Sequence, residues 1–322
     1  MLHSLSIKAR YGNVQKLSAL CDSRGIRFAT VTSQEPQDIT PDLIKSIVNI
    51  APTPELPPEF SSVLRPIHVN QLSNSLKHFT ALRMVVENST LHPNAKHVIL
   101  EDDVLFNEAD VLRLLDSTIS SSPADADIVF LGLPSTKSGT LQDVSFEKTT
   151  SVFKVLPCCD SYIVTASAAA KLINAFLPIR FPTQVQLTYL IDKLQLKSFV
   201  CSPNVFIDGS KLGVYMSSIE ANNMLIWNPQ FHQIRMILAK PSLSAEDLKT
   251  VDELLKNAHF KDHADFLYLS AQNHTLNKRY AEAEKDFSRA FDIYVAENSI
   301  FGPESMFMKD YTRIYRHLQP TF

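Results

Sequence analysis

The stretch HVILEDDVLF, residues 97–106, decides the fold that this sequence predicts. It begins with the apolar residues of a buried strand and continues with three carboxylates, Glu101, Asp102 and Asp103. Ligands in open α/β sheets bind beyond the carboxyl ends of the strands. Anions gathered there repel one another and resist desolvation unless a cation neutralises them. The stretch therefore predicts a strand that ends in a ligand site, although such acids also occur as solvated turn formers or helix caps.

Around this stretch, strand patterns alternate with helical patterns over residues 1–228. The alternation is typical of an α/β domain in which helices flank a mainly parallel sheet. Residues 34–66 are rich in proline, and we expect an irregular surface excursion or lid there. We predict strands at 26–33, 97–106, 125–133, 151–157 and 161–166, helices within 5–25 and at 70–89, 107–122, 166–177 and 185–196, and a final extended stretch at 198–218.

A second, all-α domain is predicted for residues 229–322, which are almost wholly helical in pattern. Residues 264–294 have the spacing of two helices joined by a polar turn and resemble one tetratricopeptide repeat. Small and bulky residues alternate where these helices must approach: Ala271, Ala283, Phe287 and Ala290. One repeat cannot bury its apolar face alone, so we expect flanking helices, including residues 305–318, to complete the stack. The hairpin is either a helical pad against the first domain or a groove for a protein partner.

The charge balance and the apolar runs of the sequence indicate which partners and which location to expect. The chain has 31 basic and 34 acidic residues, and this formal net charge of -3 gives no reason to expect nucleic acid or an anionic membrane. The N-terminus lacks the apolar run of a signal peptide, and no segment approaches the roughly 18–20 apolar residues of a membrane span, so we expect a cytoplasmic protein. The cysteines lack CxxC spacing and predict reduced, partly buried thiols: Cys21, Cys158, Cys159 and Cys201.

The acids after the strand have the chemistry of a metal site. Residues two apart on a strand lie on one face about 6.5–7 Å apart, so Glu101 and Asp103 are expected to converge while Asp102 points away or lies in the turn. Carboxylate oxygens suit a hard divalent ion, Mn²⁺ or Mg²⁺, which keeps open positions for phosphate oxygens.

Residues 72–106, LSNSLKHFTALRMVVENSTLHPNAKHVILEDDVLF, resemble the signature of family 25 glycosyltransferases, which include lipopolysaccharide and collagen β-galactosyltransferases. In that family a Ser-x-x-x-Lys/Ser-His helix precedes an Ile-Leu-Glu-Asp-Asp strand. Three later stretches resemble further family blocks in the same order: residues 125–133, 158–173 and 181–219. The resemblance covers about residues 1–228.

This resemblance implies a GT-A type, Rossmann-like fold and a nucleotide-sugar donor, usually a UDP-sugar. It also implies a divalent metal held by Glu101, Asp102 and Asp103, which bridges the diphosphate and stabilises charge on the departing nucleotide. The family inverts the anomeric centre, so an acceptor hydroxyl displaces the nucleotide directly and a carboxylate base is required.

The sequence departs from the family at Gln184, where many relatives carry the aspartate of a Pro-x-Asp motif. Gln184 cannot act as a base. Either another carboxylate serves, with Asp208, which we favour, and Asp160 as candidates, or this position only orients a sugar hydroxyl, or the enzyme is impaired. Asp208 precedes Gly209, which permits close approach to a ligand. Asp208 is alternatively a ligand that completes the metal shell, or a plain turn former.

Further donor-binding candidates lie on the helix before the acids and near the end of the first domain. Lys77 has the charge to neutralise a donor phosphate, and Ser73 shares its helix face; both also fit a structural or surface role. His78 fits a hydrogen-bonded interior histidine better than a ligand. The candidates near the end of the domain are expected to line a donor or acceptor pocket: Ser210, Lys211, Tyr215 and Ser218. Arg10 matches a basic position of the family and also fits a surface arginine.

The sequence thus predicts a metal-dependent, inverting glycosyltransferase that moves a sugar from a nucleotide-sugar to a hydroxyl of a glycan or protein acceptor. An inactive relative that binds glycan or protein is the alternative, and Gln184 supports it. A hydrolase using the same acids is less favoured because the sequence shows no separate nucleophile motif.

Overall fold

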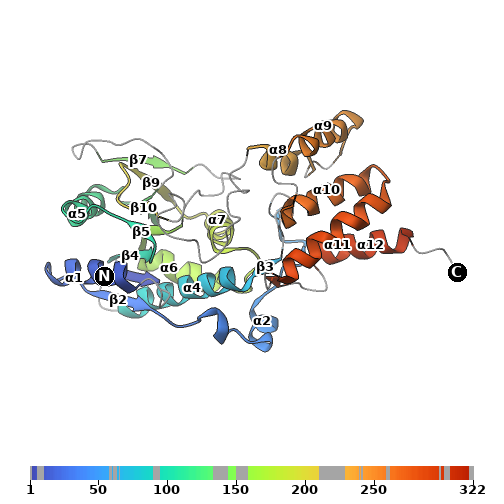
Figure 1. Ribbon diagram of the computed structural model, residues 1–322. Coiled ribbons are helices and arrows are strands. Elements are labelled where there is room, and N and C mark those ends of the chain that lie inside the picture. Colours follow the sequence, from blue (N-terminus) through green and yellow to red (C-terminus); the bar gives the residue numbers. More distant parts are fainter. Residues whose placement is uncertain are drawn as a thin grey trace. The chain divides into compact units, whose positions relative to one another are not determined.

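A computed structural model gives the structure of this protein (Figure 1). It describes residues 2–5, 11–57, 60, 64, 66–89, 95–132, 144–149, 159–209, 229–238, 240, 242–258, 262–296, 299–300 and 305–318. Within these ranges, none of the helices combines the length and the apolar character that a membrane crossing requires.

Among the described residues, seven strands form one sheet in the order β2-β1-β4-β8-β6-β9-β7. They are β1 (Leu2–Leu5), β2 (Phe28–Val31), β4 (Lys96–Glu101), β6 (Ile128–Phe130), β7 (Ser145–Lys148), β8 (Ser161–Thr165) and β9 (Ser198–Ser202). Strand β1 runs parallel to β2 and β4, and β6 runs parallel to β9. Strand β8 is antiparallel to both β4 and β6, and β7 is antiparallel to β9. The prediction of an α/β domain with helices around a central sheet is confirmed, and the sheet is mixed rather than purely parallel, because β8 and β7 run antiparallel to their neighbours.

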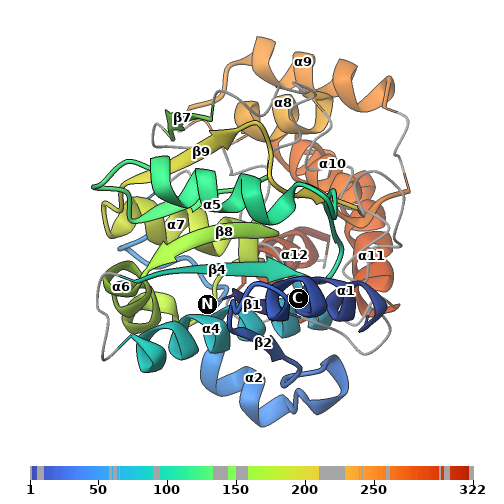
Figure 2. The same ribbon diagram turned by 90° about the vertical axis from the view of Figure 1, so that its left-hand side faces the viewer.

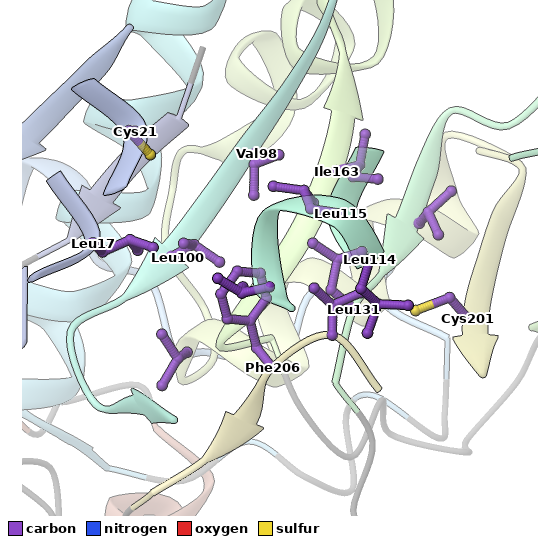
Figure 3. Packing of buried hydrophobic residues seen from close by; sticks show 14 of the residues in the cluster. Leu17, Cys21, Val98, Leu100, Leu114, Leu115, Leu131, Ile163, Cys201 and Phe206 are labelled. Carbon is purple, nitrogen blue, oxygen red and sulfur yellow. The ribbon is translucent and has the colours of Figure 1, made fainter. Parts of the chain in front are cut away.

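Helices cover both faces of this sheet. Alternation along β4 turns Val98 and Leu100 toward α1 (Tyr11–Asp22) and α5 (Val111–Ser121), where they join one apolar cluster with Leu17 and Leu115 (Figures 2 and 3). The other face meets α4 (Val69–Asn88) and α6 (Ala166–Phe176). There the rings of Phe79 and Phe176 lie 5.5 Å apart.

The cysteines of this domain are buried thiols. Cys21 of α1 and Cys201 of β9 lie in the apolar cluster of Figure 3, and burial raises the pKa of each thiol to about 11. Cys159 is also buried and reduced. The predicted reduced state agrees with the structure, although burial of these three is more complete than predicted; Cys158 lies outside the described residues.

A two-stranded sheet follows the predicted acid stretch. Strand β4 ends at Glu101, and the next two residues, Asp102 and Asp103, form a turn. After the turn, β5 (Val104–Leu105) pairs antiparallel with β10 (Ile207–Asp208). The predicted single strand over 97–106 is therefore two strands at a corner. Residues two apart lie on one face only within a continuous strand. Because the strand ends at Glu101, this rule no longer places Glu101 and Asp103 on one face.

Other elements differ from the prediction in detail. Residues 34–66 are not simply an irregular excursion, because they contain α2 (Pro41–Ile47), which Thr40 caps by accepting from the Leu43 N–H at 3.2 Å. The helix expected at 107–122 begins at Val111, since the Asn107 side chain accepts from the Ala109 N–H and organises a turn before it. Strand β7 lies in a stretch for which we predicted neither a strand nor a helix, and the strand predicted at 151–157 lies outside the described residues.

The chain divides into two compact units, residues 1–48 with 70–217, and residues 49–69 with 218–322. The sequence analysis placed a single boundary at residue 228 and assigned 49–69 to the first domain. These residues belong to the second unit because β3 (Ile67–His68) pairs antiparallel with β11 (Ser299–Ile300).

The second unit is a stack of helices, as predicted. They are α8 (Pro229–Leu238), α9 (Ala245–Lys256), α10 (Ala264–Leu276), α11 (Tyr280–Ala296) and α12 (Met306–Leu318). The small residues of the predicted hairpin, Ala271, Ala283 and Ala290, are fully buried between α10 and α11. Phe287 packs edge-on against Tyr268 and against Phe307 of α12, so α12 closes the apolar face that the hairpin leaves open.

Truncation of Phe287 should destabilise the second unit strongly. Phe287→Ala removes a fully buried ring from the α10–α12 core, which we expect to cost about 3–5 kcal/mol of unfolding free energy. Tyr315→Ala on the same stack is the matched control, because Tyr315 is 51% exposed. Urea denaturation followed by circular dichroism measures both. Equal losses for the two variants would contradict this packing.

The stability of the first unit should fall at mildly acid pH through His97. Burial, with a contribution from Arg27, lowers the pKa of His97 in β4 to about 4, whereas an unfolded histidine titrates near 6.5. Below about pH 6.5 the unfolded chain binds the extra proton, so unfolding becomes easier as the pH falls toward 4, by up to about 3 kcal/mol.

The variant His97→Gln isolates this effect, because it removes the titrating group. We expect its unfolding free energy to vary less between pH 7 and pH 4.5 than that of the unmodified protein, measured by urea denaturation at each pH. Parallel pH profiles for the two proteins would rule out His97 as the cause.

Candidate functional site

The predicted acids lie at the point where the strand order of the sheet reverses. From β1 the chain first adds β2 on one side and later β4 on the other. The register pairs Leu5 at the carboxyl end of β1 with Val31 of β2 and with Glu101 of β4. In open α/β sheets a ligand crevice forms at such a reversal, outside the carboxyl ends of the strands. The topology therefore places Glu101 beside the expected ligand crevice.

Backbone contacts gather the other acids near Glu101. The Glu101 N–H donates to the Asp160 carbonyl oxygen at 2.7 Å, which places Asp160 beside the end of β4. The Gly209 N–H donates to the Asp103 carbonyl oxygen at 2.9 Å, and Asp208 pairs with Val104. Three of these side chains are buried: Asp102, Asp103 and Asp160 are 6%, 5% and 4% exposed. The structure thus collects the predicted acids at one edge of the sheet.

Asn13 fixes the turn that carries two of these acids. Its Nδ2 donates to the carbonyl oxygens of Asp102 and Val104, at 2.8 and 2.9 Å, and ties the start of α1 to the corner between β4 and β5. The sequence analysis missed Asn13 because no local pattern links it to a turn about 90 residues later.

Gly132 allows the segment before Asp208 to cross the end of β6. The Val205 N–H donates to the Leu131 carbonyl oxygen at 2.8 Å. A Cβ atom on Gly132 would lie 2.9 Å from the Phe206 carbonyl oxygen and 3.5 Å from Asp160 Oδ2. Only glycine permits this approach. A glycine at a strand end was the sequence signal available for this position.

The Glu101 side chain points to α4 rather than into the turn. Its Oε1 accepts from Asn74 Nδ2 at 3.1 Å and contacts His78 Nε2 at 3.2 Å. Burial alone would raise the pKa of Glu101. The hydrogen bonds from His78 and Asn74 and the His78 charge outweigh burial and the repulsion from Asp208, so the net pKa lies below its ordinary value. Glu101 is therefore held as a carboxylate.

His78 is a hydrogen-bonded interior residue, as the sequence analysis favoured. It is fully buried, its Nδ1 contacts the Tyr162 hydroxyl at 3.0 Å, and the two rings stack with centroids 5.7 Å apart. The chain Tyr162–His78–Glu101–Asn74 links β8, α4 and the end of β4.

Ser73 and Lys77 contact the protein's own backbone and side chains. The Ser73 hydroxyl donates to the Gln34 carbonyl oxygen, and Lys77 Nζ lies 2.9 Å from Glu35 Oε1 in a buried ion pair. Gln34 has a φ of 66°, in the left-handed region. Both side chains therefore hold the segment after β2 against α4, and a contact with a donor phosphate stays a prediction.

The remaining candidates are only partly covered by the structure. Gln184 lies in the first turn of α7 (Thr183–Lys193), where its carbonyl oxygen accepts from the Thr188 hydroxyl at 2.8 Å. The other predicted contacts lie outside the described residues: Arg10, Ser210, Lys211, Tyr215 and Ser218.

Within the described ranges, one set of three His, Cys, Asp or Glu residues has its ligand atoms all within 4.8 Å of one another: His78, Glu101 and Cys159. Asp102 and Asp103 are not in this set, so the structure brings Glu101 together with a thiol and an imidazole. Joint ligation of a metal by Glu101, Asp102 and Asp103 stays a prediction.

Comparison of the sequence with protein-family models gave no match, and comparison with curated proteins gave none. The resemblance to family 25 glycosyltransferases therefore rests on the motifs quoted above.

Substitution of Gly132 should displace the backbone that crosses the end of β6 next to the site. Gly132→Ala forces the Phe206 backbone away from β6, and we expect a loss of about 1–3 kcal/mol in unfolding free energy. Gly12→Ala is the matched control, because its added Cβ meets nothing within 4 Å and alanine favours the helix α1. Thermal unfolding of both variants measures the difference, and a Gly132→Ala protein as stable as Gly12→Ala would contradict the close approach.

Proposed function

We propose that this protein is a metal-dependent glycosyltransferase of GT-A type. In this proposal it moves a sugar from a nucleotide-sugar, of the UDP class, to a hydroxyl of a glycan or protein acceptor, with inversion. The observation that carries the proposal is the group of carboxylates beside the strand-order reversal, between the carboxyl ends of β1 and β4. The motif resemblance over residues 72–106 supports the same function.

The acids fit a hard divalent ion by their chemistry. Asp102 and Asp103 are buried, and the charge of Asp208 acts on Glu101, so negative charge is concentrated at this edge. Carboxylate oxygens are the ligands that Mn²⁺ and Mg²⁺ prefer, and such an ion would offset the repulsion. We propose that Glu101, Asp102 and Asp103 hold the ion, and that Asp208 is either the base or a further ligand. When bound, it would neutralise the diphosphate and stabilise charge on the departing nucleotide.

The acceptor hydroxyl must lose its proton to a carboxylate of this chain. Asp160 is almost fully buried, whereas Asp208 is half-buried at the end of β10 and is the more accessible of the two. We therefore propose Asp208 as the base if it does not ligate the ion, and Asp160 in that role if it does. Neither assignment uses Gln184, which cannot accept the proton.

Two observations favour a second function. Glu101 already contacts both His78 and Asn74, and Gln184 stands where many family members carry an aspartate. Such a site is compatible with a non-catalytic relative that binds a glycan or a protein. This alternative predicts binding of an acceptor without turnover of any nucleotide-sugar.

Ligand-induced stabilisation tests the proposed function directly. Mn²⁺ with UDP at 100 times its Kd should stabilise the protein by about 2.7 kcal/mol, seen as a higher melting temperature. Asp103→Asn should abolish this shift and the transfer activity, whereas Asp116→Asn, on the exposed side of α5, should change neither. If Mn²⁺ and UDP leave the melting temperature of the unmodified protein unchanged, the transferase proposal fails.

Asp208→Asn separates the two roles proposed for Asp208. If Asp208 is the base, this variant keeps the Mn²⁺-dependent shift with UDP but loses transfer by about 100-fold or more. If Asp208 is a metal ligand, the shift is lost as well. Normal transfer by Asp208→Asn would exclude both roles.

A further inference from the structure

Three side chains from separate elements meet on the α4 side of the sheet edge, and we call them the His78–Glu101–Cys159 cluster. His78 comes from α4, Glu101 from the end of β4, and Cys159 from the segment before β8. The ligand atoms of all three lie within 4.8 Å of one another. His78 is fully buried, Cys159 is 7% exposed, and the Glu101 side chain is 17% exposed.

We propose that the His78–Glu101–Cys159 cluster is a binding site for a divalent metal ion of the zinc class. The inference goes beyond the proposed transferase activity, because it requires neither a nucleotide nor a sugar. Imidazole, carboxylate and thiolate are the three ligand types that zinc uses in proteins, and three protein ligands leave a fourth position for water. A thiolate favours zinc over Mn²⁺ or Mg²⁺.

The spacing of the cluster suits this coordination after small adjustments. A tetrahedral zinc ion with bonds of about 2.0–2.3 Å holds its ligand atoms about 3.3–3.6 Å apart. The His78 Nε2 to Glu101 Oε1 distance of 3.2 Å already matches one edge of that tetrahedron. The thiol of Cys159 lies within 4.8 Å of both other ligand atoms, so all three can reach one ion after a small contraction of the cluster.

Surrounding residues already orient two of the three ligands. Protein metal sites generally fix a histidine ligand through its second nitrogen and a carboxylate ligand through a further hydrogen bond. Here the Tyr162 hydroxyl contacts His78 Nδ1, and Asn74 donates to Glu101. The imidazole is thus held with Nε2 directed at Glu101.

Metal binding has a defined proton balance at this cluster. A metal ligand must be deprotonated, so His78 Nε2 would present its lone pair while Nδ1 keeps the ring proton beside the Tyr162 hydroxyl. Cys159 would release its thiol proton to solvent. One proton leaves per ion bound if His78 starts as the neutral imidazole, and two leave if it starts as the imidazolium whose charge lowers the pKa of Glu101.

A nucleophilic role for Cys159 fits the contacts less well. An activated thiol needs a histidine nitrogen to take its proton. Both nitrogens of His78 are already in contact with Tyr162 and Glu101. The sequence analysis found no CxxC spacing, but such spacing carries no information about a cluster that uses one cysteine.

Cobalt titration tests the site, with Co²⁺ alone as the probe and no nucleotide present. One Co²⁺ per chain should produce a thiolate-to-cobalt charge-transfer band in the near ultraviolet and the strong visible bands of tetrahedral cobalt. Cys159→Ser should abolish the charge-transfer band, whereas Cys201→Ser, at a buried thiol in β9, should retain it. No band in the unmodified protein, or a band that survives in Cys159→Ser, would overturn the proposal.

Two further variants keep the test decisive. Because His78 is fully buried, His78→Gln is first checked for folding by circular dichroism, and Tyr162→Phe provides a milder change that removes only a hydroxyl. We expect Tyr162→Phe to weaken Co²⁺ binding about 10-fold or more, as loss of an orienting partner does at other metal sites. Unchanged Co²⁺ affinity in both variants would overturn the role of His78.

Asp103→Asn separates this inference from the proposed transferase function. This variant should lose Mn²⁺-dependent UDP binding and keep the cobalt charge-transfer band. A cobalt band that disappears with Asp103→Asn would show that the thiolate site needs the turn acids, and it would overturn the proposed ligand set.

Discussion

The contacts that His78 makes with Tyr162 and Glu101 tie α4 to the middle of the sheet where β4 ends. A carboxylate buried without partners would cost several kcal/mol, and it would become protonated or turn outward. Here His78 and Asn74 keep Glu101 ionised and directed toward α4. The chain can then turn sharply after Glu101, which brings Asp103 beside the β10 segment. Asn13 then holds the turn that carries Asp102 and Asp103, through the Asp102 and Val104 carbonyl oxygens.

Local patterns predicted the parts of the structure that short-range chemistry controls. The apolar run before Glu101, the helical spacing around Leu76 and the buried small residues of the α10–α11 hairpin were all visible in the sequence. Pairing between distant segments was not visible. The insertion of β8 between β4 and β6, the β5–β10 pair and the Asn13 contacts depend on partners far along the chain. The location of the acids was therefore predictable, but not their neighbours.

Glu101 stands between two kinds of ligand. The turn after it supplies oxygen donors from Asp102 and Asp103, and the α4 side supplies nitrogen and sulfur from His78 and Cys159. Hard ions select the first kind and zinc-class ions the second. In our proposals one carboxylate is common to both, so the two kinds of ion compete for it. The metal supply of the cell would then influence which chemistry this edge of the sheet performs.

The discontinuous second unit has a consequence for biosynthesis. Strand β3 leaves the ribosome about 230 residues before its partner β11. A contact that closes so long a loop carries a large entropic cost until the intervening chain is compact. The residues of the first unit precede and follow segment 49–69 in the sequence, so they are synthesised before β11. Until β11 is made, the apolar residues Ile50, Leu56 and Ile67 lack part of the unit that buries them. During translation this segment is a natural point of contact for molecular chaperones.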